Sequence, residues 1–314
     1  MMKGEILPVS VLIPTMNRSN SLKRTLLSYL AADYVPMQVV IVDQSENDIT
    51  KEEIGRFVEG YPDISFEYIY QDMPSLTKAR NNALKAATND IVICSDDDID
   101  VYKDTLKNVY DIMSKDEYAL VAGINDNETG YSSAIGYLWG TRSFLRRNKG
   151  HVTKAMLGRY PDSVSGRVET EWAMGYFFSV KKSLVEKWGI KWDENLTSYA
   201  YAEDLDFSYI YCKKAKNDNL MCVLDENVHV LHLTSNEHRI PSIKSTYMYV
   251  ANRAYISNKY NMGFGSNIAM AWCDLGKIIE KTIKKEKPED LISARRFLRK
   301  NKKDIKKGIF NYKF

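Results

Sequence analysis

The chain has 314 residues, of which 44% are apolar and 27% charged, a composition that is ordinary for a soluble globular protein. Its formal net charge of +3 combines an acidic body with a basic end, because residues from Gly276 to Phe314 include fourteen Lys and Arg against five Asp and Glu. The four cysteines form no C-x-x-C pair, no signal-peptide core opens the chain and no run of 18 apolar residues occurs, so we expect no zinc ribbon, no classical export and no membrane crossing.

In chain order, the first 125 residues alternate between short β-branched runs and amphipathic stretches. Strands are predicted at Val9–Ile13, Gln38–Val42, Ser65–Tyr70, Asp90–Cys94 and Ala119–Ile124. Helices are predicted at Ser21–Ala31, Thr50–Val58, Leu76–Ala87 and Lys103–Ser114. This alternation predicts an α/β fold with a Rossmann-like, mostly parallel sheet that is flanked by helices and wound by right-handed crossovers. Ligands of such sheets bind beyond the carboxyl ends of the strands.

Polar residues follow three of the predicted strands. Pro14-Thr15 ends the first strand, Asp43 ends the second, and the triplet Asp96-Asp97-Asp98 follows the fourth. Neighbouring carboxylates raise one another's pKa, whereas a hard divalent cation takes oxygen ligands and commonly brings a phosphorylated substrate. The triplet therefore predicts a cation and nucleotide-diphosphate site, with a solvated, helix-capping acidic turn as the alternative. The first strand is followed by no glycine-rich turn, which argues against a dinucleotide-binding domain.

Several short segments occur in a characteristic order. They are Val9–Arg18, Val40–Ser45, Ala79–Asn81, the aspartate triplet, Trp172–Gly175 and Ala202–Phe207. Together they resemble glycosyltransferase family 2, over about residues 7–235. The resemblance implies a GT-A fold, with Trp172–Gly175 as an acceptor-side strand. It also implies a metal-dependent, inverting enzyme that moves one hexosyl or deoxyhexosyl group from a nucleotide-diphosphate sugar to a carbohydrate or lipid-linked acceptor. Polysaccharide, capsule, O-antigen or cell-wall glycan synthesis is the expected setting.

The resemblance assigns the donor site residue by residue. The expected nucleotide-sugar contacts, with UDP- or dTDP-sugars favoured, are Pro14, Thr15, Asn17, Arg18, Asp43, Arg80, Asp96 and Asp97. Asp98 is the first expected ligand of Mn²⁺ or Mg²⁺, joined by Asp96 and His232. Two structural roles stay open, because Asp43 could cap a loop and Arg80 could be a solvated helix charge. Residues three apart in a strand face opposite sides, so either His229 or His232 faces the site.

Catalysis with inversion requires a base within reach of the incoming hydroxyl, opposite the leaving group. The resemblance places this base at Asp204, with Glu203 as the second candidate, while Asp206 is expected to be a helix-start charge or a salt-bridge partner. An acidic helix N-terminus is the structural alternative. Acceptor-side loops are expected between about Asn125 and Thr170. The expected acceptor contacts are Trp172, Gly175 and Tyr201.

The basic end of the chain predicts two amphipathic helical stretches, one around Leu275–Ile283 and the other from Leu291 to Phe310. Such helices either lie on an anionic membrane surface or pack on the body or a partner subunit. We therefore divide the chain into a nucleotide-sugar-binding half (1–125), an acceptor-binding and catalytic half (126–240) and a helical, basic C-terminal region (241–314). The expected location is the cytoplasm, with peripheral attachment to the inner face of the membrane left open.

Two other functions use similar residues. A nucleotidyltransferase also combines a nucleotide, a cation and carboxylates on an α/β sheet, but it would carry a glycine- and arginine-rich turn after the first strand. A non-catalytic sugar-binding protein on the same fold would not need both the triplet and the Glu203-Asp204 pair. Nucleic acid is not expected as a partner, because the basic tail has no interleaved stacking platform. The oligomeric state is left open.

Overall fold

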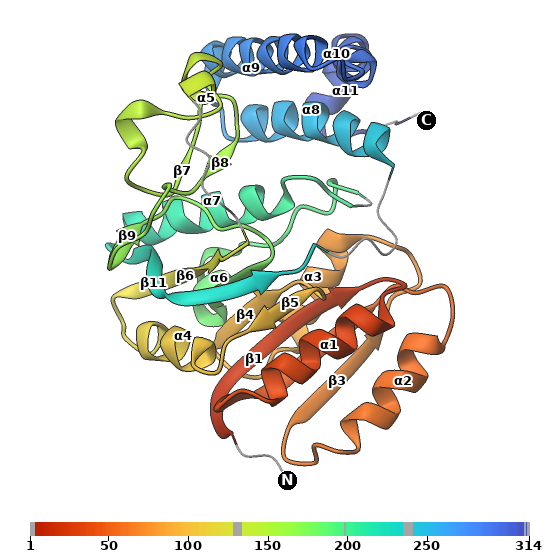
Figure 1. The fold of residues 1–314 in the computed structure, drawn as a ribbon, viewed down its shortest axis with the longest axis vertical. Helices are drawn as coiled ribbons and strands as arrows, with labels where there is room; N and C mark the ends of the chain where they lie inside the picture. Colours follow the sequence, from red (N-terminus) through yellow and green to blue (C-terminus); the bar gives the residue numbers. More distant parts are fainter. Residues whose placement is uncertain (1–3, 128–133, 198, 235–240, 311, 313–314) are drawn as a thin grey trace.

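A computed structural model describes residues 4–127, 134–197, 199–234, 241–310 and 312. Within these residues a large mixed sheet has the strand order β3-β2-β1-β4-β10-β6-β11-β5, and β9 pairs with β11 (Figure 1). The strands of this sheet are β1 (Glu5–Thr15), β2 (Tyr34–Asp43), β3 (Ser65–Tyr70), β4 (Ile91–Ser95), β5 (Ile99–Val101), β6 (Tyr118–Asn125), β9 (Arg167–Glu169), β10 (Phe177–Lys181) and β11 (Met221–His232).

The parallel part of the sheet matches the prediction. Strands β3, β2, β1 and β4 run parallel to one another. Val11 and Ile13 of β1 are buried on one face, while Leu12 is buried on the other. A parallel strand that helices cover on both sides has to be apolar on both faces, and this explains the near-continuous Val and Ile runs.

Several strands of the sheet were not predicted, among them β5, β9 and β10. Strand β10 lies antiparallel between β4 and β6, whereas Trp172–Gly175, the expected acceptor-side strand, is not a strand and precedes it as an irregular segment. The reason is visible in the backbone hydrogen bonds. The amides of Ala173, Met174 and Gly175 donate to side chains, at the Ser208 hydroxyl, the Tyr160 hydroxyl and the Asp204 carboxylate.

Helices cover both faces of the sheet. One apolar cluster joins it to α1 (Ser19–Leu30), α2 (Ile49–Val58) and α4 (Thr105–Met113). The opposite cluster joins it to α3 (Leu76–Ala86), α6 (Lys182–Trp188) and α7 (Glu203–Asn217). The four helices predicted in the first 125 residues correspond to α1, α2, α3 and α4, and each predicted end lies within two residues of the observed one. This three-layer arrangement leaves the carboxyl ends of β1 and β4 uncovered by helix, which is where the cleft described below lies.

The C-terminal helices form a further layer, stacked beyond α7 (Figure 1). They are α8 (Ser242–Lys259), α9 (Gly263–Ile283), α10 (Glu289–Lys300) and α11 (Lys302–Lys306). A third apolar cluster joins them to the hairpin of β7 (His151–Val152) and β8 (Gly158–Arg159). Nη2 of Arg253 and Oδ1 of Asp274 pair at 2.5 Å inside this cluster, and both side chains are almost fully buried. Because a buried charge is costly to leave unpaired, this ion pair ties α8 to α9.

The predicted acceptor-side loops contain only short elements, namely α5 (Ala134–Leu138), the 3₁₀ turn η1 (Phe144–Arg146), β7 and β8. Positions 128–133 of that predicted stretch lie outside the described residues. Among the helices that are described, none combines the length and the apolar character that a membrane crossing requires.

Candidate functional site

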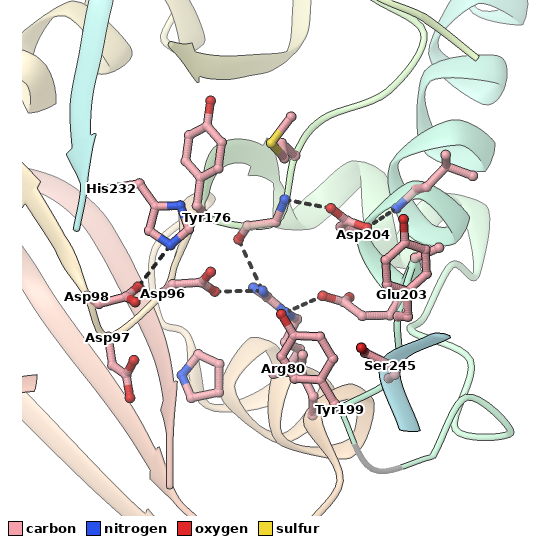
Figure 2. A pocket seen from close by; sticks show the side chains of 18 of the residues that line it. Arg80, Asp96, Asp97, Asp98, Tyr176, Tyr199, Glu203, Asp204, His232 and Ser245 are labelled. Carbon is pink, nitrogen blue, oxygen red and sulfur yellow. Dashed lines mark hydrogen bonds and ion pairs between the residues drawn. The ribbon is translucent and has the colours of Figure 1, made fainter. Parts of the chain in front are cut away.

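A cleft of about 1090 Å³ lies at the carboxyl ends of the central strands, and the acidic triplet forms part of its wall. Most of the residues predicted for the site line it, namely Pro14, Thr15, Arg18, Arg80, Asp96, Asp97, Asp98, Trp172, Gly175, Tyr201, Glu203, Asp204 and His232. Asn17 and Asp43 are not part of this lining. Figure 2 shows the triplet and His232 on one side of Arg80, with Glu203 and Asp204 on the other.

Three side chains form a compact group of oxygen and nitrogen ligands. Ligand atoms of Asp96, Asp98 and His232 all lie within 4.8 Å of one another. The group forms because β5 follows the triplet directly and pairs antiparallel with β11, which places His232 opposite Ile99. Nε2 of His232 then lies 3.1 Å from Oδ1 of Asp98. His229 instead contacts Asp126, with Nδ1 2.5 Å from Oδ1, so His232 is the histidine that faces the cleft.

Asp97 turns away from this group toward the first strand. Its Oδ2 accepts a hydrogen bond from the Thr15 hydroxyl at 2.7 Å, and its Oδ1 accepts one from Nη1 of Arg18 at 3.0 Å. Burial raises the pKa of Asp97 to about 7, against the opposing effect of Arg18. The middle aspartate therefore fixes Thr15 and Arg18 at the end of β1, where the sequence had placed donor contacts.

Arg80 connects the two acidic sides of the cleft. Its side chain is buried, with 3% of the residue exposed. Nη2 donates to Oδ1 of Asp96 and to the carbonyl of Gly175, both at 3.0 Å. Nε lies 3.1 Å from Oε1 of Glu203, but the N–H does not point at the carboxylate, so this contact is an ion pair without a hydrogen bond. Arg80 is thus the centre of a buried charge network rather than a solvated helix charge.

Asp204 is held in place by backbone donors. The amide of Gly175 donates to Oδ2 at 2.8 Å, and the amide of Leu205 donates to Oδ1 at 2.7 Å. A side chain on Gly175 would meet both neighbours, because an added Cβ would lie 3.1 Å from Cβ of Asp204 and 3.2 Å from Nη2 of Arg80. Glycine at this position therefore allows the two charged side chains to approach one another.

Backbone strain precedes the Glu203-Asp204 pair. Ala200 and Ala202 both adopt the left-handed conformation, with φ of 52° and 67°, at a cost of about 1–2 kcal/mol each for a non-glycine residue. Strain of this kind persists where the surrounding structure fixes it, commonly at functional sites. The strained turn starts α7 inside the cleft, so that Glu203 and Asp204 occupy its first turn.

Carboxylates outnumber cations in the cleft. The cleft contains the five carboxylates of the triplet, Glu203 and Asp204, against the guanidinium groups of Arg18, Arg80 and Arg159. Burial is the largest cause of the raised pKa of Asp96 and of Asp204. Burial also raises the pKa of Glu203 to about 8, and its Oε2 has no hydrogen-bond partner within the described structure. A bound divalent cation would stabilise the ionised forms, and two carboxylates with one imidazole suit Mn²⁺ or Mg²⁺. The side chains present therefore fit a metal site.

Other predicted residues have structural contacts. The carboxylate of Asp43 accepts hydrogen bonds from the Ser45 amide and hydroxyl and from the Tyr68 hydroxyl. Asn17 has a positive φ of 55°, and its backbone amide donates to the Ser45 hydroxyl at 2.8 Å. The Trp172 side chain is largely buried and packs against Tyr160, with ring centroids 5.0 Å apart. Their assigned roles in binding remain predictions.

The structure confirms the salt bridge expected of Asp206 and shows two further residues of the cleft that were not predicted from the sequence. Lys259 of α8 pairs with Asp206 at 2.7 Å, in agreement with the expected salt-bridge role. Tyr176, whose ring lies 5.3 Å from the His232 ring, lines the cleft, and so does Arg159. Arg159 had no sequence signal, because it follows an irregular segment with no motif around it.

Comparison with known proteins extends this picture. The profile of the family described as Glycosyl transferase family 2 matches residues 10–187, which is more than half of the chain. A curated relative, the GalNAc(5)-diNAcBac-PP-undecaprenol beta-1,3-glucosyltransferase of Campylobacter jejuni, is 26% identical over 185 residues, or 57% of this chain. The match spans about half the length of that relative, 53%.

Solved structures show a similar fold. The mannosyltransferase PcManGT of Pyrobaculum calidifontis, in complex with GDP-Man and Mn²⁺, aligns with a TM-score of 0.59 and 16% identity, over 94% of this chain and 79% of that one. GalNAc-T7 with UDP, GalNAc and Mn²⁺ aligns with a TM-score of 0.57 and 15% identity, over 86% and 54% of the two chains. Likeness at this level of identity concerns the fold alone.

Proposed function

Because the chain belongs to glycosyltransferase family 2 and is therefore a transferase with a GT-A fold, we propose that it is a metal-dependent, inverting glycosyltransferase. It moves a single sugar from a nucleotide-diphosphate sugar to a glycan or lipid-linked acceptor, in polysaccharide, capsule, O-antigen or cell-wall glycan synthesis. The observation that carries the proposal is the placement of two acidic groups on opposite sides of Arg80, one built as a ligand set and the other held by backbone donors.

The donor lies on the side of the triplet in this proposal. Asp98, Asp96 and His232 would hold Mn²⁺ or Mg²⁺, which when bound offsets the negative charge that develops on the leaving nucleoside diphosphate. Thr15 and Arg18 at the end of β1 bind the nucleotide, together with Pro14, Asn17 and Asp43. Arg80 stays fixed by Asp96 and Glu203, and its positive charge faces the same region of the cleft.

Asp204 is the base in this proposal. Its carboxylate lies across the cleft from the ligand set and is oriented by two amides, which leaves its position defined before the acceptor enters. Glu203 is tied to Arg80 and supports the network rather than receiving the proton. The oxygen of an acceptor hydroxyl placed between Asp204 and the anomeric carbon would attack that carbon and lose its proton to Asp204. The bond between the anomeric carbon and the diphosphate oxygen would break at the same time.

The acceptor is proposed to be lipid-linked. The relative from Campylobacter jejuni is by its name a transferase to a PP-undecaprenol-linked glycan, and the division into a donor half (1–125) and an acceptor half (126–240) leaves Trp172, Gly175 and Tyr201 on the acceptor side. A UDP- or dTDP-sugar remains the favoured donor, although a similar fold holds GDP-Man in the Pyrobaculum enzyme.

Peripheral membrane contact through α9 fits such an acceptor. The two predicted amphipathic stretches differ in what covers their apolar sides. In the second stretch, Leu291 of α10 and Ile305 of α11 are buried against the body. The outer side of α9 instead exposes a stripe of apolar side chains, Phe264 at 78%, Ile268, Trp272, Leu275 and Ile283 at 75%.

A second group of exposed apolar side chains extends this stripe. Nε1 of Trp272 donates to the carbonyl of Leu138 at 2.9 Å, which places α5 beside α9. The exposed residues there are Ile135, Leu138, Phe144 and Leu145, the last at 94%. Exposed basic residues nearby in the sequence are Arg147, Lys284, Lys285 and Lys287. An exposed apolar surface with basic neighbours suits an anionic membrane, in a cytoplasmic protein attached to the inner face.

A nucleotide-sugar panel with Mn²⁺ or Mg²⁺ tests the proposed chemistry. The expected result is a rise in Tm with one donor and the metal, accompanied by slow hydrolysis of that donor. Asp98→Asn should abolish the metal-dependent part of the shift. Asp100→Asn is the matched control, since Asp100 is two residues away but pairs with Arg24 outside the cleft. Equal shifts in wild type and Asp98→Asn would contradict the metal assignment.

A further inference from the structure

Arg159 is the arginine of the cleft for which the described residues supply no acidic partner. Nε of Arg159 donates to the carbonyl of Thr141 and Nη1 donates to its neighbour Gly158, both at 2.8 Å. These acceptors are neutral, and within the described residues Arg159 forms no ion pair with a carboxylate. Burial lowers the pKa of Arg159. By contrast, Arg18 and Arg80 each pair with aspartate.

A second cation lies near Arg159. Nζ of Lys277, on α9, sits 4.0 Å from the centroid of the Tyr249 ring. Burial, followed by the positive charges of Arg253 and Arg159, lowers the pKa of Lys277 to about 8. Arg253 is compensated by its ion pair with Asp274, whereas no ion pair of Lys277 is present within the described part of the chain. Among the residues that the structure describes, neither Arg159 nor Lys277 therefore has a carboxylate as an ion-pair partner, and the positive charge of Arg159 acts on Lys277.

Arg159 lies in the wall of the cleft, and Lys277 is connected to that wall through Tyr249. Arg159 lines the cleft, as does Tyr201, whose ring packs against Tyr249 at 5.4 Å between centroids. The indole N–H of Trp172 donates to the Arg159 carbonyl at 3.3 Å. Arg159 is therefore joined to the residues expected to meet the acceptor.

We propose that Arg159, supported by Lys277, forms a subsite for a phosphate or diphosphate ester carried by the acceptor. The proposal rests on the proposed glycosyl transfer and specifies its acceptor class as anionic. A guanidinium presents paired N–H donors that match phosphate oxygens, and a group with two or more negative charges compensates both cations at once. A neutral glycan would leave these two charges buried without compensation.

The position of Lys277 on α9 is consistent with a lipid-linked ester. Lys277 follows Trp272 by five positions, which turns it by about 140° around the helix from the exposed apolar stripe. The subsite thus lies on the inner side of the helix whose outer side we assign to the membrane. A phosphate on the inner side and a lipid chain at the outer side would belong to the same acceptor.

Calorimetric titration with two probes tests the subsite without donor or metal. Inorganic pyrophosphate and geranyl diphosphate are titrated into the full-length protein in the presence of EDTA. We expect both to bind wild type, geranyl diphosphate at least threefold more tightly. Arg159→Gln should weaken binding at least tenfold and Lys277→Gln several-fold, whereas Arg159→Lys should retain part of it. Arg56→Gln removes an equal charge from an exposed position on α2, away from the cleft and from α9, and should bind as wild type does.

Each result then has a defined meaning. Asp98→Ala should bind the probes normally, and a loss in that variant would place the anion in the donor site and overturn the proposal. No binding to wild type, or unchanged binding in Arg159→Gln, would also overturn it. Equal affinity for the two probes would indicate a site for free anions rather than for a lipid-linked acceptor. The metal-dependent donor shift should persist in Arg159→Gln, so failure of the subsite and failure of the transferase proposal are distinguishable.

Discussion

Replacement of Gly175 by alanine tests how closely Asp204 and Arg80 must approach. The added Cβ would lie 3.1 Å from Cβ of Asp204, 3.2 Å from Nη2 of Arg80 and 3.3 Å from Oδ2 of Asp204. These separations are a few tenths of an ångström shorter than ordinary carbon contacts, so both charged side chains have to move by about that amount. A displacement of 1 Å in an active site can cost about 100-fold in rate, so we expect roughly a tenfold loss.

The assay is the rate of hydrolysis of the donor that stabilises the protein, measured at saturating metal. Donor affinity of Gly175→Ala should stay within about threefold of wild type, because the ligand set of Asp96, Asp98 and His232 lies across Arg80 from Asp204. Overpacking is expected to cost about 1–3 kcal/mol of stability. Gly55→Ala is the control, since an added Cβ there meets nothing within 4 Å. Full activity in Gly175→Ala would refute the reasoning that this close approach positions Asp204.

The remaining predictions concern the base, the buried glutamate and the membrane. Asp204→Asn should keep donor binding and lose transfer by at least 100-fold in radiolabel assays; loss of donor binding instead would mean that the base is misplaced. Glu203, whose pKa burial raises to about 8, keeps its proton below that pH in the folded protein and becomes the charged partner of Arg80 only as the pH approaches 8. In the unfolded chain it releases the proton above about pH 4.5. Stability should therefore fall as pH rises from about 5 to 8, and the Tm advantage of Glu203→Gln over wild type should grow across that window; a constant difference would contradict the shift. Phe264→Ser should reduce sedimentation with phosphatidylglycerol vesicles about tenfold, since burying a phenylalanine contributes about 1.5–3 kcal/mol, whereas Leu27→Ser, exposed on α1, should not.

Much of the donor side could be predicted because its signals are local. Strands β1 and β2 carry apolar residues on both faces, which specifies a covered parallel strand without knowledge of its neighbours. The apolar run Ile91–Cys94 placed the triplet at a strand end, and the order of the short segments indicated the family. His232 could be singled out only together with this order, since its place beside Asp98 depends on the pairing of β5 with β11.

The remaining features depend on contacts between distant residues. Trp172–Gly175 is not a strand because side chains from elsewhere in the chain capture the amides of residues 173–175. The amphipathic tail was ambiguous for a related reason. Hydrophobic periodicity shows that a helix has an apolar side but not what covers that side, so α9 and α10 could not be distinguished. Arg159 was not predicted, because only the folded structure shows which carboxylates lie near an arginine.

The central claim is that a cation held by Asp98, Asp96 and His232 binds the diphosphate of the donor. Anomalous diffraction from crystals grown with Mn²⁺ and the stabilising nucleotide sugar tests this most directly. We expect one manganese peak that is bonded to Asp98 and His232 and in contact with the diphosphate. A diphosphate bound in the cleft with no manganese at these residues, or manganese bound at another site, would contradict it.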